Sequence, residues 1–202
     1  MARKSTRNII IDVAARLFAT KGLRRTTMES IASEAGRGRR TVYMYFGNKA
    51  DIYEAVVQME ISRITDPLRE VVRSDSDFET MLRRYAAERV AQLFNLRQRN
   101  PLLLKDYAQG HSRVERLRER LNNDEIKLLT PIFRRYLKEN SSHPNGGPAS
   151  YAVIFLNLLR GTDRLLTRDN GYAEALQVTA FGTDLFIRGM TCKDQPVPAL
   201  IN

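Results

Sequence analysis

Residues 26–46, TTMESIASEAGRGRRTVYMYF, decide how the amino-terminal part of this chain folds. The stretch contains two short helical patterns separated by the tight turn Gly36–Arg37–Gly38. Thr26 at the start of the first pattern, with Glu29 three residues later, predicts an N-cap and a capping box. The second pattern covers residues 39–45. Two short helices joined by a glycine-containing turn predict a helix-turn-helix unit, whose second helix is expected to enter the major groove of DNA.

The residues on either side of this unit supply the rest of a small helical domain. Apolar residues recur at three- and four-residue spacing over residues 8–20, which predicts a first helix that ends near Gly22. A longer helix is expected over residues 48–66. Pro67 is expected to interrupt it, because proline lacks an N–H donor and restricts the residue before it. We therefore predict two domains, at residues 5–65 and 66–202.

Positive charge is concentrated in the same part of the chain. The 202 residues carry a formal net charge of +10, and residues 1–50 hold 11 Lys and Arg against three Asp and Glu. The other 152 residues hold 22 basic against 20 acidic side chains, so nearly all the excess lies in the first quarter. Such a concentration is typical of phosphate binding. A solvated basic face without a partner is the alternative.

A set of residues at fixed spacing also carries a family resemblance. The set is Ala14–Ala15–x–Leu17–Phe18, Gly22, Thr26–Thr27, Ile31–Ala32–x–x–Ala35–Gly36, Thr41–x–Tyr43–x–Tyr45–Phe46 and Asn48–Lys49. With these residues, the stretch 9–56 resembles the N-terminal domain of TetR-type transcriptional repressors. The resemblance implies a homodimer that binds a palindromic double-stranded DNA operator and is released by a small-molecule effector in its C-terminal domain. Repression, rather than activation, rests on this resemblance alone.

The resemblance also implies roles for basic residues around the second helix of the unit. Arg39 and Arg40 are the candidates for reading bases, because Arg pairs bidentately with guanine O6 and N7. Thr41 is a candidate contact for a thymine methyl group. Arg37 stands where the family usually has a small apolar residue, and its guanidinium is expected to extend toward DNA while its stem covers the core. Lys49 resembles the family's phosphate-binding lysine.

Hydroxyl groups are the other candidates for contacts to the DNA backbone. Thr26 or Thr27, at a helix N-terminus, can offer a hydroxyl and free amides to a phosphate. Tyr43 and Tyr45 can reach phosphates with their hydroxyl groups. One of these two tyrosines could instead belong to the core, and Phe46 is expected to be a core residue.

The rest of the chain has no comparable motif, but its hydrophobic periodicity predicts further helices and an all-α fold with a larger C-terminal domain. Ser76 with Glu79, and Ser112 with Glu115, predict two more capping boxes. Four side chains on helices that would wall a pocket are candidate effector contacts, although aromatic residues at helical spacing are more often core residues. They are Tyr85, Arg89, Tyr107 and His111.

Residues 149–168 and 172–190 are apolar on more than one face. A helix of this kind must be covered on two sides, and in a small domain a second subunit can cover one of them. The sequence therefore predicts homodimerisation through these two helices. The expected interface residues are Phe155, Leu158, Leu159, Leu166, Phe181, Leu185 and Phe186.

Several classes of protein are excluded by what the sequence lacks. His111 and His143 have no metal-ligand spacing, and no catalytic or cofactor-binding motif occurs, so we expect no enzyme, metal or cofactor. No run of about 18 apolar residues occurs, which excludes a membrane-spanning protein. The single cysteine, Cys192, indicates a reducing, cytoplasmic setting. A sequence-independent DNA-coating protein remains the alternative function.

Overall fold

The computed structural model describes residues 5–109, 115–140 and 146–191. In these ranges the chain forms nine α-helices, one short 3-10 helix and no strand, which confirms the predicted all-α fold. None of the helices described is long and apolar enough to cross a membrane. His111, Ser112, His143 and Cys192, which the sequence singled out, lie outside the described residues.

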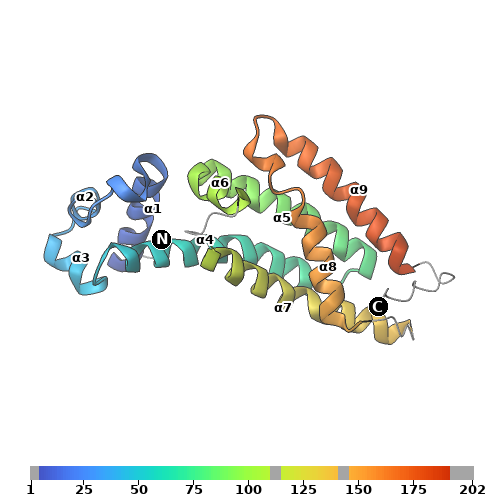
Figure 1. The fold of residues 1–202 in the computed structure, drawn as a ribbon. Helices are drawn as coiled ribbons and strands as arrows, with labels where there is room; N and C mark the ends of the chain where they lie inside the picture. Colours follow the sequence, from blue (N-terminus) through green and yellow to red (C-terminus); the bar gives the residue numbers. More distant parts are fainter. Residues whose placement is uncertain (1–4, 110–114, 141–145, 192–202) are drawn as a thin grey trace, which may run out of the picture.

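Three helices form one end of the molecule, and a fourth leads from them into a larger helical bundle (Figure 1). The first three are α1 (Thr6–Arg25), α2 (Met28–Glu34) and α3 (Arg39–Tyr45), and the fourth is α4 (Lys49–Arg73). In the bundle, α4 packs against α5 and α7, α8 packs on α7, and α9 packs on α5. The remaining elements are α5 (Phe78–Arg99), α6 (Pro101–Gln109), α7 (Glu115–Glu139), α8 (Pro148–Arg160), η2 (Leu165–Thr167) and α9 (Gly171–Thr191).

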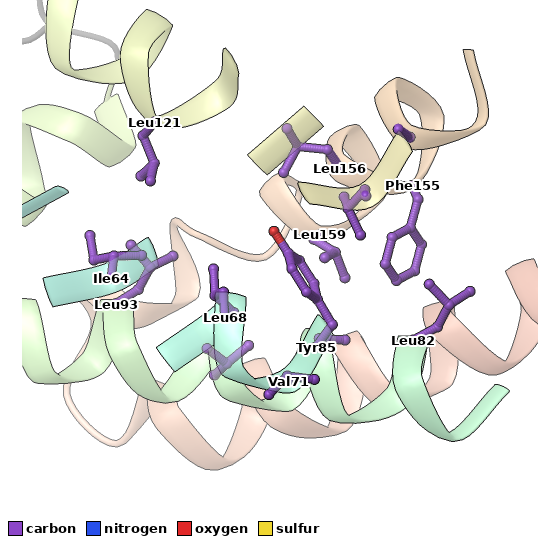
Figure 2. Close-up of a cluster of buried hydrophobic side chains, with 14 of the residues drawn as sticks. Ile64, Leu68, Val71, Leu82, Tyr85, Leu93, Leu121, Phe155, Leu156 and Leu159 are labelled. Atoms are coloured by element: carbon purple, nitrogen blue, oxygen red, sulfur yellow. The ribbon is translucent and has the colours of Figure 1, made fainter. Parts of the chain in front are cut away.

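The buried apolar side chains form two separate clusters. The smaller cluster joins α1, α2 and α3 to the beginning of α4 and ends at Val56, whereas the larger begins at Val57 and extends to Ile187. Figure 2 shows part of the larger cluster, where the ring of Tyr85 stands among apolar side chains with its hydroxyl oxygen at the tip. Helix α4 therefore contributes to both cores, and the two-domain division at residues 65 and 66 stays a prediction.

The predicted interruption of the fourth helix at Pro67 is wrong. Helix α4 continues through Pro67 to Arg73. A proline inside a helix costs about 3 kcal/mol, mainly through a lost hydrogen bond and a clash with the preceding turn. Ile64 and Leu68, on either side of Pro67, are almost completely buried, as is Val71 at 8% exposure. Burial of such side chains contributes about 1.5–3 kcal/mol each, which outweighs the cost of the proline.

Helix ends differ from the sequence prediction by small shifts. Gly22 leaves helical geometry at φ 78°, as expected, but helix resumes after it and reaches Arg25. The cap of α5 is Asp77, whose side chain accepts a hydrogen bond from the Thr80 amide, and not Ser76 with Glu79. A carboxylate accepts hydrogen bonds from these amides as well as a serine hydroxyl does, so Asp77 takes the place of the predicted Ser76.

Candidate nucleic-acid interface

Helix α3 is fixed on one side and exposed on the other. Val42 is completely buried and Phe46 is 5% exposed, so these two residues anchor the helix in the smaller core, as the sequence predicted for Phe46. Tyr43 and Tyr45 are 42% and 46% exposed, so neither belongs to the core. Met44, which the sequence analysis did not select, is the most exposed large apolar residue of this helix.

Arginines gather on the exposed side of α3 and on the turn before it. Arg37, Arg39 and Arg40 are all exposed. Arg37 follows Gly36, whose φ of 59° allows the chain to turn sharply after α2. Gly38 caps α3 without a side-chain hydrogen bond, and its carbonyl accepts hydrogen bonds from the amides of Thr41 and Val42.

Arg39 is held in place by neighbours on both sides. Its guanidinium forms a 2.7 Å ion pair with Glu29 of α2 and lies 5.7 Å from the centre of the Tyr43 ring. Hydrogen bonding to Tyr43 and the charge of Glu29 raise the pKa of Arg39 above its usual value. The pKa of Glu29 is lowered by hydrogen bonds to its own backbone amide and to Thr27, with a smaller contribution from the charge of Arg39. Among the described residues, Arg40 has no such ion pair.

The threonine pair before α2 is shifted by one residue from the predicted arrangement. Thr27, not Thr26, is the N-cap, and its partner in the capping box is Ser30 rather than Glu29. Thr26 is completely buried, and its hydroxyl donates a 2.9 Å hydrogen bond to the carbonyl of Gly22. Thr26 therefore cannot offer its hydroxyl to a phosphate, while Thr27 stays exposed at the start of the helix.

Lys49, the expected phosphate-binding lysine, already makes hydrogen bonds within the chain. Its Nζ donates hydrogen bonds to the carbonyls of Leu23 and Thr26, at 2.9 and 2.8 Å. These carbonyls lie at the end of α1, where the last carbonyl groups lack partners within the helix. Lys49 thus joins the beginning of α4 to the end of α1, and its ammonium group is already engaged.

We expect Lys49→Met to lower the free energy of unfolding by about 2 kcal/mol, because hydrogen bonds to a charged donor are lost and two carbonyls lose their partner. Urea unfolding followed by circular dichroism measures this change. Lys21→Met, at an exposed position of α1, is the matched control and should leave the unfolding curve unchanged. An unchanged curve for Lys49→Met, together with weaker DNA binding, would restore the phosphate-binding role.

Three of the four candidate effector contacts meet in one buried polar cluster of the larger domain. Arg89, 1% exposed, donates to Glu125 through Nε at 2.8 Å and to both oxygens of Asp163 at 2.6 and 3.2 Å. Its Nη2 also lies 3.3 Å from the Tyr107 hydroxyl, and Tyr85 donates to Glu125 at 3.2 Å. These contacts make Tyr85, Arg89 and Tyr107 part of an ion-pair cluster inside the bundle.

The sequence analysis missed both acidic members of this cluster. Glu125 stands four residues after Leu121 and four before Leu129, so a core-facing position on α7 was the available signal. Burial raises the pKa of Glu125, against the opposing charge of Arg89. One oxygen of Glu125, Oε2, has no hydrogen-bond partner among the described residues. Burial also raises the pKa values of Tyr85 and Tyr107, so both keep their protons at neutral pH.

An apolar surface lies across α8 and α9, but its members differ from the predicted interface. Phe155, Leu159 and Leu166 are buried in the core of the chain, at 1% exposure or less, so they cannot meet a second subunit. Leu158 and Phe186 are half-buried against the same core. We define the α8–α9 apolar face by its exposed residues, which are Val153, Ile154, Val178, Phe181 and Leu185.

Comparison with known proteins supports the resemblance seen in the sequence. The sequence pattern described as "Bacterial regulatory proteins, tetR family" matches residues 10–56. The chain is 37% identical over 70 residues to the HTH-type transcriptional regulator AcrR of Shigella flexneri, which covers 32% of this chain and 33% of AcrR. It is 31% identical over 80 residues to the HTH-type transcriptional repressor KstR2 of Rhodococcus jostii, which covers 40% of this chain and 39% of KstR2.

These matches cover 33% of AcrR and 39% of KstR2, whereas the fold is shared over nearly the whole chain. The crystal structure of the transcriptional regulator FadR from Bacillus subtilis, in complex with stearoyl-CoA, has a TM-score of 0.69 to this chain at 14% identity. The superposition covers 90% of this chain and 98% of FadR. At this identity the similarity concerns the fold.

Proposed function

We propose that this chain, which belongs to the TetR family of bacterial regulatory proteins, binds a palindromic DNA operator as a homodimer and releases it when the larger domain takes up a small molecule. The observation that carries the proposal is the exposed side of α3, a helix anchored by Val42: two arginines and two tyrosines of this helix are exposed, and so is Arg37 on the turn before it. Because the relatives are transcription regulators, the chain is not an enzyme. Repression is proposed from the family resemblance, since the matched relatives include both a named repressor, KstR2, and a named activator, FasR of Mycolicibacterium smegmatis.

The exposure of each side chain and its ion pairs indicate different roles in DNA contact for the residues of this face. Arg40, exposed and without an ion pair among the described residues, is the best placed to read a guanine. Arg39 is oriented by Glu29 and can keep a fixed direction toward the groove. Arg37 and the hydroxyl groups of Tyr43 and Tyr45 are proposed to contact phosphates, which fix the register of the protein on DNA. Thr27 is exposed and Thr41 is only partly buried, so both side chains are accessible and remain proposed contacts to DNA.

Helix α4 provides the connection between the two ends of the molecule. Arg63 of α4 pairs with Asp12 of α1 and with Glu60, and Glu60 also accepts hydrogen bonds from Arg99 of α5. Glu60 is only 1% exposed, so these pairs hold its side chain in place in the interior. A movement of α5 in the larger domain is thereby transmitted through α4 to α1. We propose that the effector acts by this route, which changes the separation of the two recognition helices in the dimer.

The effector itself is proposed from the fold and the family. In the FadR structure the bound molecule is stearoyl-CoA, which shows that this architecture can hold an organic ligand in that protein. The buried cluster around Arg89 occupies the interior of the larger domain of this chain. A DNA-binding regulator acts where the genome lies, so the proposal also places the protein in the cytoplasm.

Selection of bound sequences from random double-stranded DNA tests the proposed function. The wild-type chain should return a palindrome whose half-sites lie about 34 Å apart, one turn of DNA. Arg40→Ala should relax the preference at one position of each half-site and cost about 1–3 kcal/mol of binding there. Arg16→Ala, at an exposed position of α1, is the control and should return the wild-type palindrome. Recovery of random sequences would instead support a DNA-coating protein.

A further inference from the structure

We propose that a polar cleft in the larger domain binds the oxyanion group of a small molecule, a phosphate or a carboxylate. The cleft has a volume of about 450 Å³ and lies between α6, the beginning of α7 and the end of α8. Its basic side chains are Arg118 of α7, Arg160 of α8 and Arg164 of the following turn. This volume is within the range of small-molecule sites, about 300–1,000 Å³.

The charge of the cleft favours an anion. Arg160 and Arg164 form no ion pair with any described residue, and Arg118 has a single weak partner, Glu115, at 3.4 Å. The acidic residue of the lining, Asp163, accepts hydrogen bonds from Arg89 through both of its oxygens, and Arg89 is shared with Glu125, so the three arginines of the lining face one carboxylate that already has a partner. Guanidinium groups are suited to phosphate and carboxylate because their planar N–H donors match two oxygens at once.

Two uncharged groups add directed hydrogen bonds to this charge. Tyr107, in the lining of the cleft and 3% exposed, accepts a hydrogen bond from Arg89 Nη2 at 3.3 Å, so its own proton is not used in that contact. The Asn157 side chain also lines the cleft from the exposed side of α8. The position of Tyr107 and Asp163 connects the cleft to the buried Arg89 cluster, which forms its inner wall.

This inference rests on the proposed function, because it assigns the charged group of the effector to a site. Arg118 lies two residues before Arg120, and Arg120 pairs with Glu54 of α4. An anion held between Arg118 and the two arginines of α8 and its turn would restrain the beginning of α7. The Arg120–Glu54 pair would transmit that restraint to α4 close to the smaller core.

Isothermal titration calorimetry of the DNA-free protein tests the site directly, with inorganic pyrophosphate and with succinate at matched ionic strength. We expect one of these anions to bind saturably, with one site per chain, and the two titrations to show whether phosphate or carboxylate is preferred. Arg160→Ala/Arg164→Ala should weaken this binding at least tenfold. Arg134→Ala, at an exposed position of α7 outside the cleft, is the matched control.

The basic face of α3 could also attract anions, so Arg37→Ala/Arg40→Ala is a second control. It should leave saturable anion binding unchanged if the site is the cleft. Absence of saturable binding of both anions to the folded wild-type protein would overturn the inference, as would equal affinity in the Arg160→Ala/Arg164→Ala variant. Since no DNA is present, either result would leave the proposed operator binding intact.

Discussion

Arg89→Met lowers the free energy of unfolding by about 3–5 kcal/mol, because it leaves two buried carboxylates without their cation. Asp163 loses a bidentate partner and Glu125 loses its 2.8 Å contact. Both carboxylates lie at 5% exposure or less, so water replaces the guanidinium only in part. Urea unfolding of the variant and the wild type at neutral pH measures the loss. The matched control is Arg83→Met, because Arg83 pairs with Asp184 and Glu79 on the surface and such pairs contribute about 0–1 kcal/mol.

The size of this loss should depend on pH in a defined direction. Burial raises the pKa of Glu125 even beside Arg89, and removal of Arg89 removes the charge that opposes this shift. A raised pKa in the folded state means that the folded variant binds a proton that the unfolded chain has already released. The penalty is therefore smallest at and below the pKa of an unfolded glutamate, about 4.3, and grows as the pH rises above it.

A triple variant separates charge from packing. Arg89→Met/Glu125→Gln/Asp163→Asn carries no buried charge at these positions and should recover most of the lost stability, since neutral groups cost less to bury. If Arg89→Met alone is as stable as the wild type at neutral pH, the interpretation of this cluster as a set of buried ion pairs is wrong.

The smaller domain could be predicted closely because local signals determine it. Gly36 marks the turn, and Val42 and Phe46 lie at the spacing that anchors α3 in a core. The exposed positions of Arg37 and Arg40 follow from that spacing. Where the sequence-based prediction of this domain was wrong, it was wrong about the positions of single side chains. Thr26 and Thr27 are equivalent caps in sequence, and only packing of the chain around Gly22 decides which of them is buried.

The contacts of Lys49 and of the Arg89 cluster could not be predicted, since they join distant parts of the chain. Lys49 meets the carbonyl of Leu23, 26 residues earlier. Arg89 meets Glu125 and Asp163 at separations of 36 and 74 residues. Periodicity identifies which positions face a core, but it does not show which charged side chains meet there.

The apolar helices of the carboxyl-terminal part show a different limit. Periodicity indicated that α8 and α9 are apolar on two sides, but not which side faces the chain's own core. Phe155 lies in the core and Phe181 is 66% exposed, although both were predicted in the interface. The two helices pack closely at Gly182, where an added Cβ would lie 3.1 Å from a methyl carbon of Leu158.

Phe181→Glu/Leu185→Glu should convert the proposed homodimer into a folded monomer. These residues lie on the α8–α9 apolar face at 66% and 52% exposure, so each introduced carboxylate would be solvated in the monomer but buried without a partner in a dimer. Analytical ultracentrifugation of the wild type and the variant measures the oligomeric state. Circular dichroism should show unchanged helix content, because exposed substitutions usually alter stability by no more than about 0.5 kcal/mol.

Loss of the dimer should also reduce operator affinity by about 100-fold to 10,000-fold, because two linked recognition helices bind far more tightly than one. Leu102→Glu supplies the control, since Leu102 is 48% exposed on α6, away from the α8–α9 apolar face. That variant should remain dimeric and keep wild-type affinity. If Phe181→Glu/Leu185→Glu remains a dimer, the subunits meet elsewhere. If it becomes monomeric yet binds the operator as tightly as the wild type, a single α3 accounts for recognition and the spacing of half-sites has no role in release.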